Sequence, residues 1–418
     1  MSALAKRATL LLVTALALLG AACGGGSASE STPTKPPLNI GVMYDGTGAT
    51  QSIGLPFKNG IEDYVRLVNS KGGVEGHPVN VQLIEMAYEV ARGVEAYERM
   101  KQDGAVMVLA WGSGTLAAIA ERCNADRVPC IIPGGGVARM ADGQKYPFIF
   151  PMTANFWSQA AAAVKYALDQ WKAEGRPGKP KIAFIYNDTA GGREPIELLQ
   201  RIAQLEGFEL RLFAVPLPGL DLSAQVQDIV QRYRADWVVS HLFGRSPSVA
   251  IKQFKEVGFP LNHVINLGPG ASDDAVRAAG GWDVAEGFLG AVYTDMGTDL
   301  PILAEITKMY QEEGRQPPPD ITQSNTYYVQ GVADAALMVE GLRQAVKKYG
   351  YPLDGVKARD GLRLIRGNVA GVVSVQMSER DHEGGGQVRI YQVKGGRWQP
   401  VTEWFSAYRD VIQQMLQS

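Results

Sequence analysis

Apolar and polar positions follow two alternating periods along most of the chain. Short apolar runs rich in β-branched residues recur from residue 38 onward; they read LNIGVMY, VNVQLIEM, GAVMVLAW, VPCIIPG, KIAFIYND, FELRLFAV, DWVVSHL and HVINLG. The segments between them, such as GIEDYVRLVN and PIELLQRIAQLEG, have apolar residues at helical spacing and a polar outer face. Strands that alternate with helices in this way predict parallel sheets covered by helices, so the expected fold class is α/β.

The alternation pauses once, near the middle of the chain. In residues 146–180 a short strand leads into a long helix and then into a loop rich in proline, glycine and lysine. The pattern restarts at Lys181 and continues for a similar length, which predicts two doubly wound parallel-sheet lobes. No internal repeat is visible at the level of single residues.

The first 23 residues have the pattern of an export signal. Lys6 and Arg7 precede an apolar run at residues 8–19, which is shorter than the roughly 20 residues that span a bilayer. Cys23 stands three residues after Gly20, and the stretch resembles a bacterial lipobox, in which the signal is cut before a cysteine that then carries lipid. Because Gly20 stands where that motif usually has leucine, an ordinary cleaved signal peptide is the alternative.

The lipobox interpretation sets the expected location. Residues 1–22 would be removed as a signal peptide, and residues 23–37, which are rich in glycine, serine, threonine and proline, would form a lipid-anchored flexible linker. We therefore expect a lipoprotein of the periplasm or cell surface that is held at the membrane by its N-terminal lipid.

Composition and charge exclude several classes of function. Hydrophobic residues make up 46% and charged residues 20% of the 418, and 41 basic against 43 acidic residues give a net charge of −2. Nucleic acid is therefore not an expected partner. Four scattered histidines, without HExxH or CxxC spacing, predict no metal site and no cofactor. Because neither a GxSxG elbow nor a GxGxxG fingerprint is present, an enzyme is not expected.

Two further cysteines follow Cys23. Cys123 ends a predicted helix, and Cys130 lies in the next strand. In an exported chain, a disulfide between them and a pair of buried free thiols are both open, because helix and strand geometry need not bring the sulfurs together.

Glycine and small hydroxyl residues are concentrated where the predicted strands end. These strand exits are residues 44–50, 111–115, 134–136, 187–192, 241–246 and 268–272. In open parallel sheets, ligands bind beyond the carboxyl ends of the strands. A helix N-terminus there offers unpaired N–H groups and a positive dipole end to an anion such as a carboxylate. Ser113, Gly114 and Thr115 have this chemistry, and a simple N-cap without a ligand is the alternative.

Three segments carry a resemblance to a known family. GTGATQSIGLPFKNGIEDYVRLVNSKGGVEGHPVNVQLIE resembles the opening of the type I periplasmic substrate-binding proteins of branched-chain amino acid ABC transporters. The residues at the family's spacing are Gly48, Gly54, Gly60, Asn69, Gly72, Gly73 and Gly76. TYYVQGVADAALMVEGLRQA resembles the family's tyrosine-containing helix, and MSERDHEGGGQVRIYQVKGGRW resembles its closing β-hairpin. The resemblance runs from about Leu38 to Trp404.

The resemblance implies a two-lobed clamp of the Venus-flytrap kind, joined by a three-strand hinge. Such a clamp closes on a small molecule and delivers it to ABC permease subunits with cytoplasmic ATPases, and we expect it to be a monomer. A ligand sensor that acts on a partner protein is the alternative to transport.

The resemblance also implies where the lobes divide. The crossings are expected near Met152, near Val292 and after Tyr349. The N-terminal lobe would then comprise residues 38–152 and 293–349. The C-terminal lobe would comprise residues 153–292 and 350–418.

The chain departs from the family's amino acid binders at the positions that hold the ligand. Gly136 takes the approximate place of a threonine that helps to hold the amino acid. The acid that pairs with the ligand's ammonium should fall near Gly270, where no carboxylate is present. A buried ammonium without an acidic partner is costly, so a standard amino acid would require Asp188, Asp45 or Glu85 as a substitute.

These departures favour an aromatic or other organic carboxylate as the ligand. Trp111, Phe243 and Tyr44 would wall an apolar body, and the glycines would admit it close to the main chain. Arg245 or His241 would pair with the carboxylate. The alternatives are packing for the aromatics, a solvated charge for Arg245 and a structural role for His241. A branched-chain amino acid or amide is the alternative ligand. The predicted ligand-binding residues are Tyr44, Trp111, Ser113, Gly114, Thr115, Gly134, Gly135, Gly136, Asp188, Phe243, Arg245 and Gly270.

Overall fold

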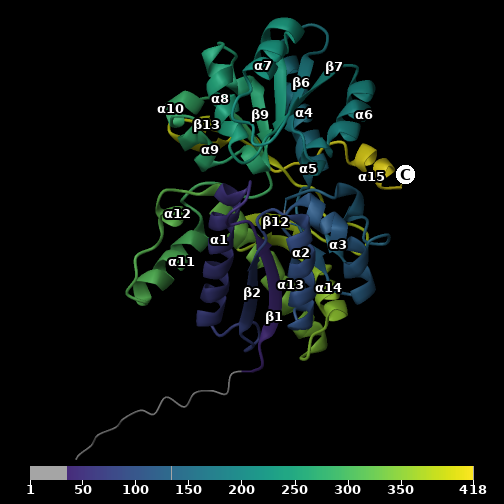
Figure 1. The fold of residues 1–418 in the computed structure, drawn as a ribbon, viewed down its shortest axis with the longest axis vertical. Coiled ribbons are helices and arrows are strands. Elements are labelled where there is room, and N and C mark those ends of the chain that lie inside the picture. The colour runs from purple at the N-terminus through teal and green to yellow at the C-terminus, as the bar shows by residue number, and fades with distance from the viewer. Residues whose placement is uncertain (1–34, 133, 418) are drawn as a thin grey trace, which may run out of the picture. The chain divides into compact units, whose positions relative to one another are not determined.

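Residues 35–132 and 134–417 are described by a computed structural model, in which helices cover both faces of two β-sheets (Figure 1). The expected export signal, Cys23 and most of the expected linker lie outside the described residues. We call the five-stranded sheet with its helices the N-terminal lobe, and the seven-stranded sheet with its helices the C-terminal lobe. Most neighbouring strands in both sheets are parallel, which confirms the predicted α/β fold.

The N-terminal sheet is parallel throughout, in the order β2-β1-β3-β4-β5. Its strands are β1 (Leu38–Tyr44), β2 (Val79–Glu85), β3 (Val108–Leu109), β4 (Cys130–Ile131) and β5 (Ile149–Phe150). Its helices are α1 (Gln51–Ser70), α2 (Val90–Gln102), α3 (Ser113–Asp126), α11 (Pro301–Glu312), α12 (Pro319–Thr322), α13 (Thr326–Tyr349) and α14 (Gly355–Leu362). Successive side chains of a strand point to opposite faces. Ile40 and Val42 of β1 therefore pack with α1 and α13, whereas Met43 packs with α2.

Two glycines let α1 and α13 approach closely. A side chain on Gly60 of α1 would overlap the carbonyl group of Tyr328, and a side chain on Gly331 of α13 would overlap the carbonyl group of Phe57. The contact between these two glycines and the opposite helices fixes α1 against α13. Phe57 and Gln330, which both line the pocket described below, are held in place by it.

The C-terminal sheet has the order β14-β13-β10-β9-β8-β6-β7, with an antiparallel hairpin at one edge. Its strands are β6 (Lys181–Asn187), β7 (Glu209–Val215), β8 (Trp237–His241), β9 (Val264–Leu267), β10 (Leu289–Val292), β13 (Arg389–Lys394) and β14 (Arg397–Pro400). Its helices are α4 (Phe156–Ala173), α5 (Ala190–Arg193), α6 (Ile196–Glu206), α7 (Ser223–Gln227), α8 (Ser246–Glu256), α9 (Asp273–Ala278), α10 (Trp282–Ala285) and α15 (Arg409–Gln417). Figure 1 shows α4 and α6 on one side of the strands and α8 to α10 on the other. Ile182 and Phe184 of β6 pack with α4 and α6, and Ala183 and Ile185 pack with α8.

The chain passes between the two sheets three times. The first passage follows β5 and enters α4 at Phe156, and the second follows β10 and enters α11 at Pro301. The third lies between β12 (Val373–Gln376) and β13. Arg409 of α15 holds this third passage, because it donates to the carboxylates of Glu383 at 2.5 Å and Asp381 at 3.1 Å.

The last segment divides differently from the expectation. Residues 350–418 were expected in the C-terminal lobe, but α14 and the hairpin of β11 (Arg366–Val369) and β12 belong to the core of the N-terminal lobe. Leu362 and Val373 share a buried cluster with Leu337 of α13. The reason is the apolar face of α14, which has to be buried and finds α13 directly before it in the chain. Only the part of this segment that follows the third passage joins the C-terminal lobe.

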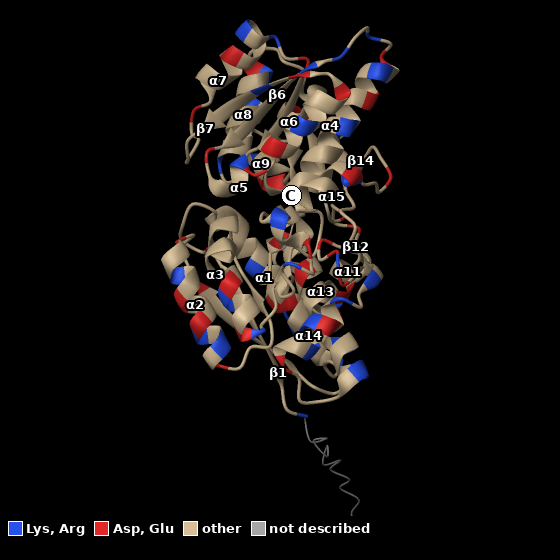
Figure 2. Ribbon diagram, turned by 90° about the vertical axis from the view of Figure 1, so that its right-hand side faces the viewer, with Lys and Arg blue, Asp and Glu red and all other residues tan. Residues whose placement is uncertain are grey.

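Charged residues of both signs are interspersed along the outer helices (Figure 2). Between α2 and α3 they form ion pairs, with Arg122 at 2.9 Å from Glu98 and Lys101 at 2.8 Å from Asp126. Across the described part of the chain, every helix is too short or too polar to cross a bilayer.

Cys123 and Cys130 are joined by a disulfide, with their Cα atoms 6.1 Å apart. The bond links the last turn of α3 to β4, and both residues are fully buried. The two alternatives left open by the sequence are therefore decided in favour of the disulfide.

Reduction should destabilise the N-terminal lobe. The bond closes a loop with a sequence separation of 7, and a short crosslink of this kind contributes about 2 kcal/mol by restricting the unfolded chain. We expect a reductant to lower the midpoint of thermal unfolding of the wild type. The double variant Cys123→Ser, Cys130→Ser is the control, and its midpoint should not respond. A reductant that leaves the wild type unchanged would contradict the role of the bond.

Candidate ligand-binding site

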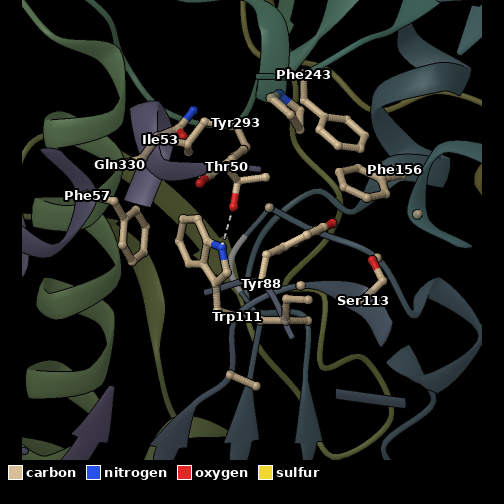
Figure 3. A pocket seen from close by; sticks show the side chains of 18 residues that line it. Thr50, Ile53, Phe57, Tyr88, Trp111, Ser113, Phe156, Phe243, Tyr293 and Gln330 are labelled. Atoms are coloured by element: carbon tan, nitrogen blue, oxygen red, sulfur yellow. Dashed lines mark hydrogen bonds between the residues drawn. The ribbon is translucent and has the colours of Figure 1, made fainter. Parts of the chain in front are cut away.

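A pocket lies where the carboxyl ends of strands from both lobes meet (Figure 3). The space that its residues enclose, including the part open to solvent, is about 740 Å³. The lining residues are Thr50, Ile53, Phe57, Tyr88, Ala110, Trp111, Gly112, Ser113, Ile132, Gly134, Gly135, Gly136, Phe156, Gly191, Phe243, Pro269, Tyr293 and Gln330. Among the described residues the lining therefore has no acidic, basic or histidine side chain.

Trp111 provides an apolar wall whose one polar atom is already bonded. It follows β3, its ring packs edge-on against Phe57 with centroids 5.1 Å apart, and its Nε1 donates to Thr50 Oγ1 at 2.9 Å. Phe156 and Phe243 cover the opposite side of the pocket, from the C-terminal lobe. The indole can thus offer a ligand its ring but not its N–H group.

Asp45 stabilises the loop that carries Thr50. Its carboxylate accepts the backbone N–H groups of Thr47, Gly48 and Thr50 and the hydroxyl of Thr50, and the residue is completely buried. All of these bonds lie within residues 45–50. Asp45 is therefore a structural acid of its own turn and is not available to a ligand.

Two other acids that were considered as partners of an ammonium also have protein partners. Glu85 accepts from the backbone of Gly46 and Ala87. Burial would raise the pKa of Glu85, but these hydrogen bonds outweigh it and hold the pKa below its usual value. Asp188 pairs with Arg193 at 2.5 Å. Neither acid lines the pocket.

Glu194 is an acid beside the glycine loop. Its carboxylate accepts the backbone N–H of Ala138 and lies against Gly136, although the residue does not line the pocket. Burial raises the pKa of Glu194 to about 7. Near neutral pH this carboxyl is therefore partly protonated.

The N-terminus of α3 faces the pocket without a side-chain cap. The helix begins at Ser113, directly after Gly112 with φ of +83°, and in the part of the chain that the structure describes it has no side-chain cap. Both residues line the pocket. Helix N-termini leave such N–H groups for a ligand or water and carry a positive partial charge.

The glycine loop at residues 134–136 lines the pocket. Other side chains lie so close to two of its glycines that no larger residue has room there. Gly134 has φ of +50°, and a side chain there would overlap the ring of Tyr293. A side chain on Gly136 would overlap Ser113 and approach the carboxylate of Glu194. The expected room at Gly136 is thus taken by protein, and the glycine is needed for the approach of these two residues.

Two phenols of the lining remain neutral at physiological pH. Burial raises the pKa of Tyr88, and the charge of Asp45 adds to this effect. Burial also raises the pKa of Tyr293 far above its usual value, with a further contribution from Asp334. Both hydroxyls can therefore act as uncharged hydrogen-bond donors.

The structure brings half of the predicted binding residues to the pocket. Those that line it are Trp111, Ser113, Gly134, Gly135, Gly136 and Phe243. Those that do not are Tyr44, Gly114, Thr115, Asp188, Arg245 and Gly270.

The residues outside the pocket have other roles or partners. Arg245 is an exposed residue at the start of α8, and Thr115 is buried against Gly93 of α2. A side chain on Gly270 would overlap Asn266 and the carbonyl group of Leu242, so this glycine is required by packing.

His241 is a buried neighbour of the pocket. It lies edge-on to Phe156, at 4.1 Å between centroids, and burial lowers its pKa to about 3. The imidazole is therefore uncharged and cannot pair with a carboxylate as a cation.

Several lining residues were missed in the sequence. Tyr88, Phe156 and Tyr293 follow β2, β5 and β10, so the rule that located the other strand exits would have found them. Phe57 and Gln330 lie within helices, and only the close contact of α1 and α13 brings them to the pocket. No group of three or more potential metal ligands occurs in residues 35–132 and 134–417.

Known proteins of one kind are similar to this chain. A family model described as periplasmic binding protein matches residues 37–397. A Leu/Ile/Val-binding protein homolog from Brucella suis is 23% identical over 366 residues, which cover 84% of this chain and 90% of the relative.

Two solved structures share the fold over most of the chain. One, described as an ABC transporter permease from the Pseudomonas fluorescens group, is 31% identical, with a TM-score of 0.82 over 91% of this chain and 95% of that one. The other, a branched-chain amino acid ABC transporter protein from Thermus thermophilus with bound valine, is 21% identical, with a TM-score of 0.79 over 92% of this chain and 100% of that one.

These matches confirm the resemblance expected from the sequence. The family model covers both lobes, and the family consists of solute binders and not of enzymes. The chain belongs to the periplasmic binding protein family, with the type I fold of ABC transporter substrate-binding proteins of the branched-chain amino acid class.

Proposed function

We propose that this protein binds a small organic carboxylate with an aromatic or other apolar body and delivers it to an ABC permease. The observation that carries the proposal is the composition of the pocket lining. Aromatic rings dominate it, and its described residues include no ionisable acid, base or histidine. Such a pocket suits an apolar body whose polar end is bound by uncharged donors.

A zwitterionic amino acid fits this lining poorly. Its ammonium group would be taken from water without a carboxylate to receive it, which costs several kcal/mol. Asp45, Glu85 and Asp188 are bonded to other parts of the protein and lie outside the lining. Glu194 is also outside it, and its carboxylate already accepts from Ala138.

A carboxylate can be bound here without a cation. The uncapped N-terminus of α3, the hydroxyl of Ser113 and the hydroxyl of Tyr88 are all donors at or near the lining. Backbone N–H groups at a helix N-terminus, together with the helix dipole, are sufficient to bind an anion. We assign this end of the pocket to the carboxylate of the ligand.

Closure of the lobes would bury the ligand. Phe243 of the C-terminal lobe packs with Ile53 and Tyr327 of the N-terminal lobe, and the hydroxyl of Tyr327 donates to the carbonyl of Pro269 at 2.9 Å. These contacts border the pocket and are made only when the lobes are together. A ligand that touches both lobes adds to them and so favours the closed state.

The protein would act outside the cytoplasm as a lipoprotein monomer held at the membrane through Cys23. The family supports a role with permease subunits and their ATPases. Transport of a branched-chain amino acid is the second candidate, because the Brucella suis relative carries Leu/Ile/Val in its name.

A thermal-shift screen of the purified protein tests the ligand class. A ligand that binds only the folded protein raises its melting temperature. We expect benzoate-type and other apolar carboxylates to raise it, and leucine, isoleucine and valine to leave it unchanged at the same concentration. Stabilisation by the three amino acids and not by the carboxylates would contradict the proposal and favour the second candidate.

Ser113→Ala should weaken the binding of an aromatic carboxylate found in that screen. Loss of a hydrogen bond to a charged group should reduce the affinity by about tenfold or more. Arg245→Ala is the control, because Arg245 is exposed and lies outside the pocket. The affinity of this variant for the same carboxylate should stay within about twofold of the wild type. Both affinities can be measured by isothermal titration calorimetry. The reverse order of effects would place the carboxylate at Arg245 and refute the assignment.

Cys23→Ala tests the lipid anchor. In cells, the wild type should fractionate with membranes, and the variant should move to the soluble extracytoplasmic fraction. Ser27→Ala, in the same expected linker, is the control and should fractionate like the wild type. Unchanged membrane association of the Cys23 variant would exclude anchoring through that residue.

A further inference from the structure

The end of the pocket nearest the hinge contains a buried amide without a partner. Gln330 of α13 lines the pocket and is only 5% exposed, yet its side-chain Nε2 has no hydrogen-bond partner among the described residues. A buried amide in this condition is unfavourable, because it has lost its hydrogen bonds to water without gaining others. An unsatisfied donor at a ligand site is satisfied when a ligand or water occupies it.

Two further buried residues, next to Tyr293 in the chain and one turn from Gln330 on α13, have unpartnered polar groups, although neither lines the pocket. Asp334 lies one helical turn after Gln330 and therefore on the same face of α13, is 1% exposed, and has no hydrogen bond to either carboxylate oxygen. Thr294, which follows Tyr293 in the second passage between the lobes, is also buried with its hydroxyl unpartnered. Burial raises the pKa of Asp334 far above its usual value. Among the described residues, the polar groups near this end of the pocket thus include several without a hydrogen bond.

The two polar ends of the pocket lie on opposite sides. Figure 3 shows Ser113 and Gln330 apart, with Trp111 and Thr50 between them. Trp111 and Thr50 are bonded to each other, so the middle of the pocket presents mainly ring surface. A ligand that fills the pocket has its polar groups at its ends and its apolar part in the middle.

We propose that Gln330 is a specificity-determining residue, which hydrogen-bonds a second polar group at the end of the ligand opposite to its carboxylate. The inference rests on the proposed function and narrows the ligand class to aromatic or similarly rigid acids with a distal hydroxyl or carbonyl group. A carboxamide both donates and accepts, and the hydroxyl of Tyr293, which also lines the pocket, can donate. A distal hydroxyl matches these groups, whereas a methyl group of similar size leaves them unsatisfied.

Calorimetric titration of the purified protein with para-hydroxybenzoate and para-methylbenzoate tests this inference. The two acids differ only in the distal group, and the wild type should bind the hydroxy acid about tenfold more tightly, because a site built for a hydroxyl rejects the analogue that lacks it. In Gln330→Met this preference should fall to about twofold or less, with little change for the methyl acid. Gln344→Met is the control on the same helix, since its amide bonds Glu340 outside the pocket, and it should keep the wild-type preference.

The possible results separate this inference from the proposed function. A wild type that binds both acids equally, or a Gln330→Met variant that keeps the preference, overturns the role of Gln330 and leaves the carboxylate class intact. Failure of both acids and of benzoate to bind the wild type overturns the aromatic class and this inference together. If Gln330→Met does not fold, as judged by circular dichroism, Gln330→Leu replaces it and is expected to lose the same preference. The preference of the wild type for the hydroxy acid tests the inference in either case.

Discussion

The close approach of the glycine loop at residues 134–136 to Tyr293 and Ser113 is the constraint on which the pocket depends. No side chain fits at Gly134 or Gly136 while those two residues keep their positions. The approach brings together the end of β4, the N-terminus of α3 and the second passage between the lobes. The carboxylate end and the hinge end of the pocket are therefore built around one short piece of backbone, and a change there would disturb both.

The electrostatics of the pocket follow from how the nearby acids are used. Asp45 ties its own turn together, Asp188 pairs with Arg193, and Glu194 accepts from Ala138. What remains for a ligand is a set of neutral donors and aromatic rings. In a low-dielectric space such donors bind an acceptor or an anion well, whereas an ammonium group would find no acidic side chain among the described lining residues. The chemistry of the ligand is thus limited by bonds that the protein makes within itself.

The strand pattern was sufficient to predict the fold and six of the eighteen residues that line the pocket. Trp111, Ser113 and Phe243 stand at strand exits, and the parallel-sheet rule directs these to a common edge. Phe57 and Gln330 could not be found in this way, because their positions depend on two glycine contacts between helices that are far apart in the sequence.

Other predictions differed from the structure because the same residue can either bind a ligand or stabilise the fold, and the sequence does not distinguish the two roles. The sequence shows that no carboxylate is present near Gly270. It does not show that a side chain at this position would overlap Asn266. Asp45 was a reasonable partner for an ammonium until its four contacts within the turn were known. The boundary at residue 350 failed because the amphipathic α14 can cover either lobe, and adjacency to α13 decides between them.

The proposed function requires that the pocket accept a carboxylate and offer no partner to an ammonium group. Calorimetric titration with hydrocinnamate and phenylalanine tests it most directly, since the two compounds share the ring and the carboxylate and differ only in the α-ammonium group. We expect hydrocinnamate to bind more tightly by about tenfold or more. Tighter binding of phenylalanine would contradict it and would indicate that an acid beside the pocket, with Glu194 as the first candidate, receives the ammonium.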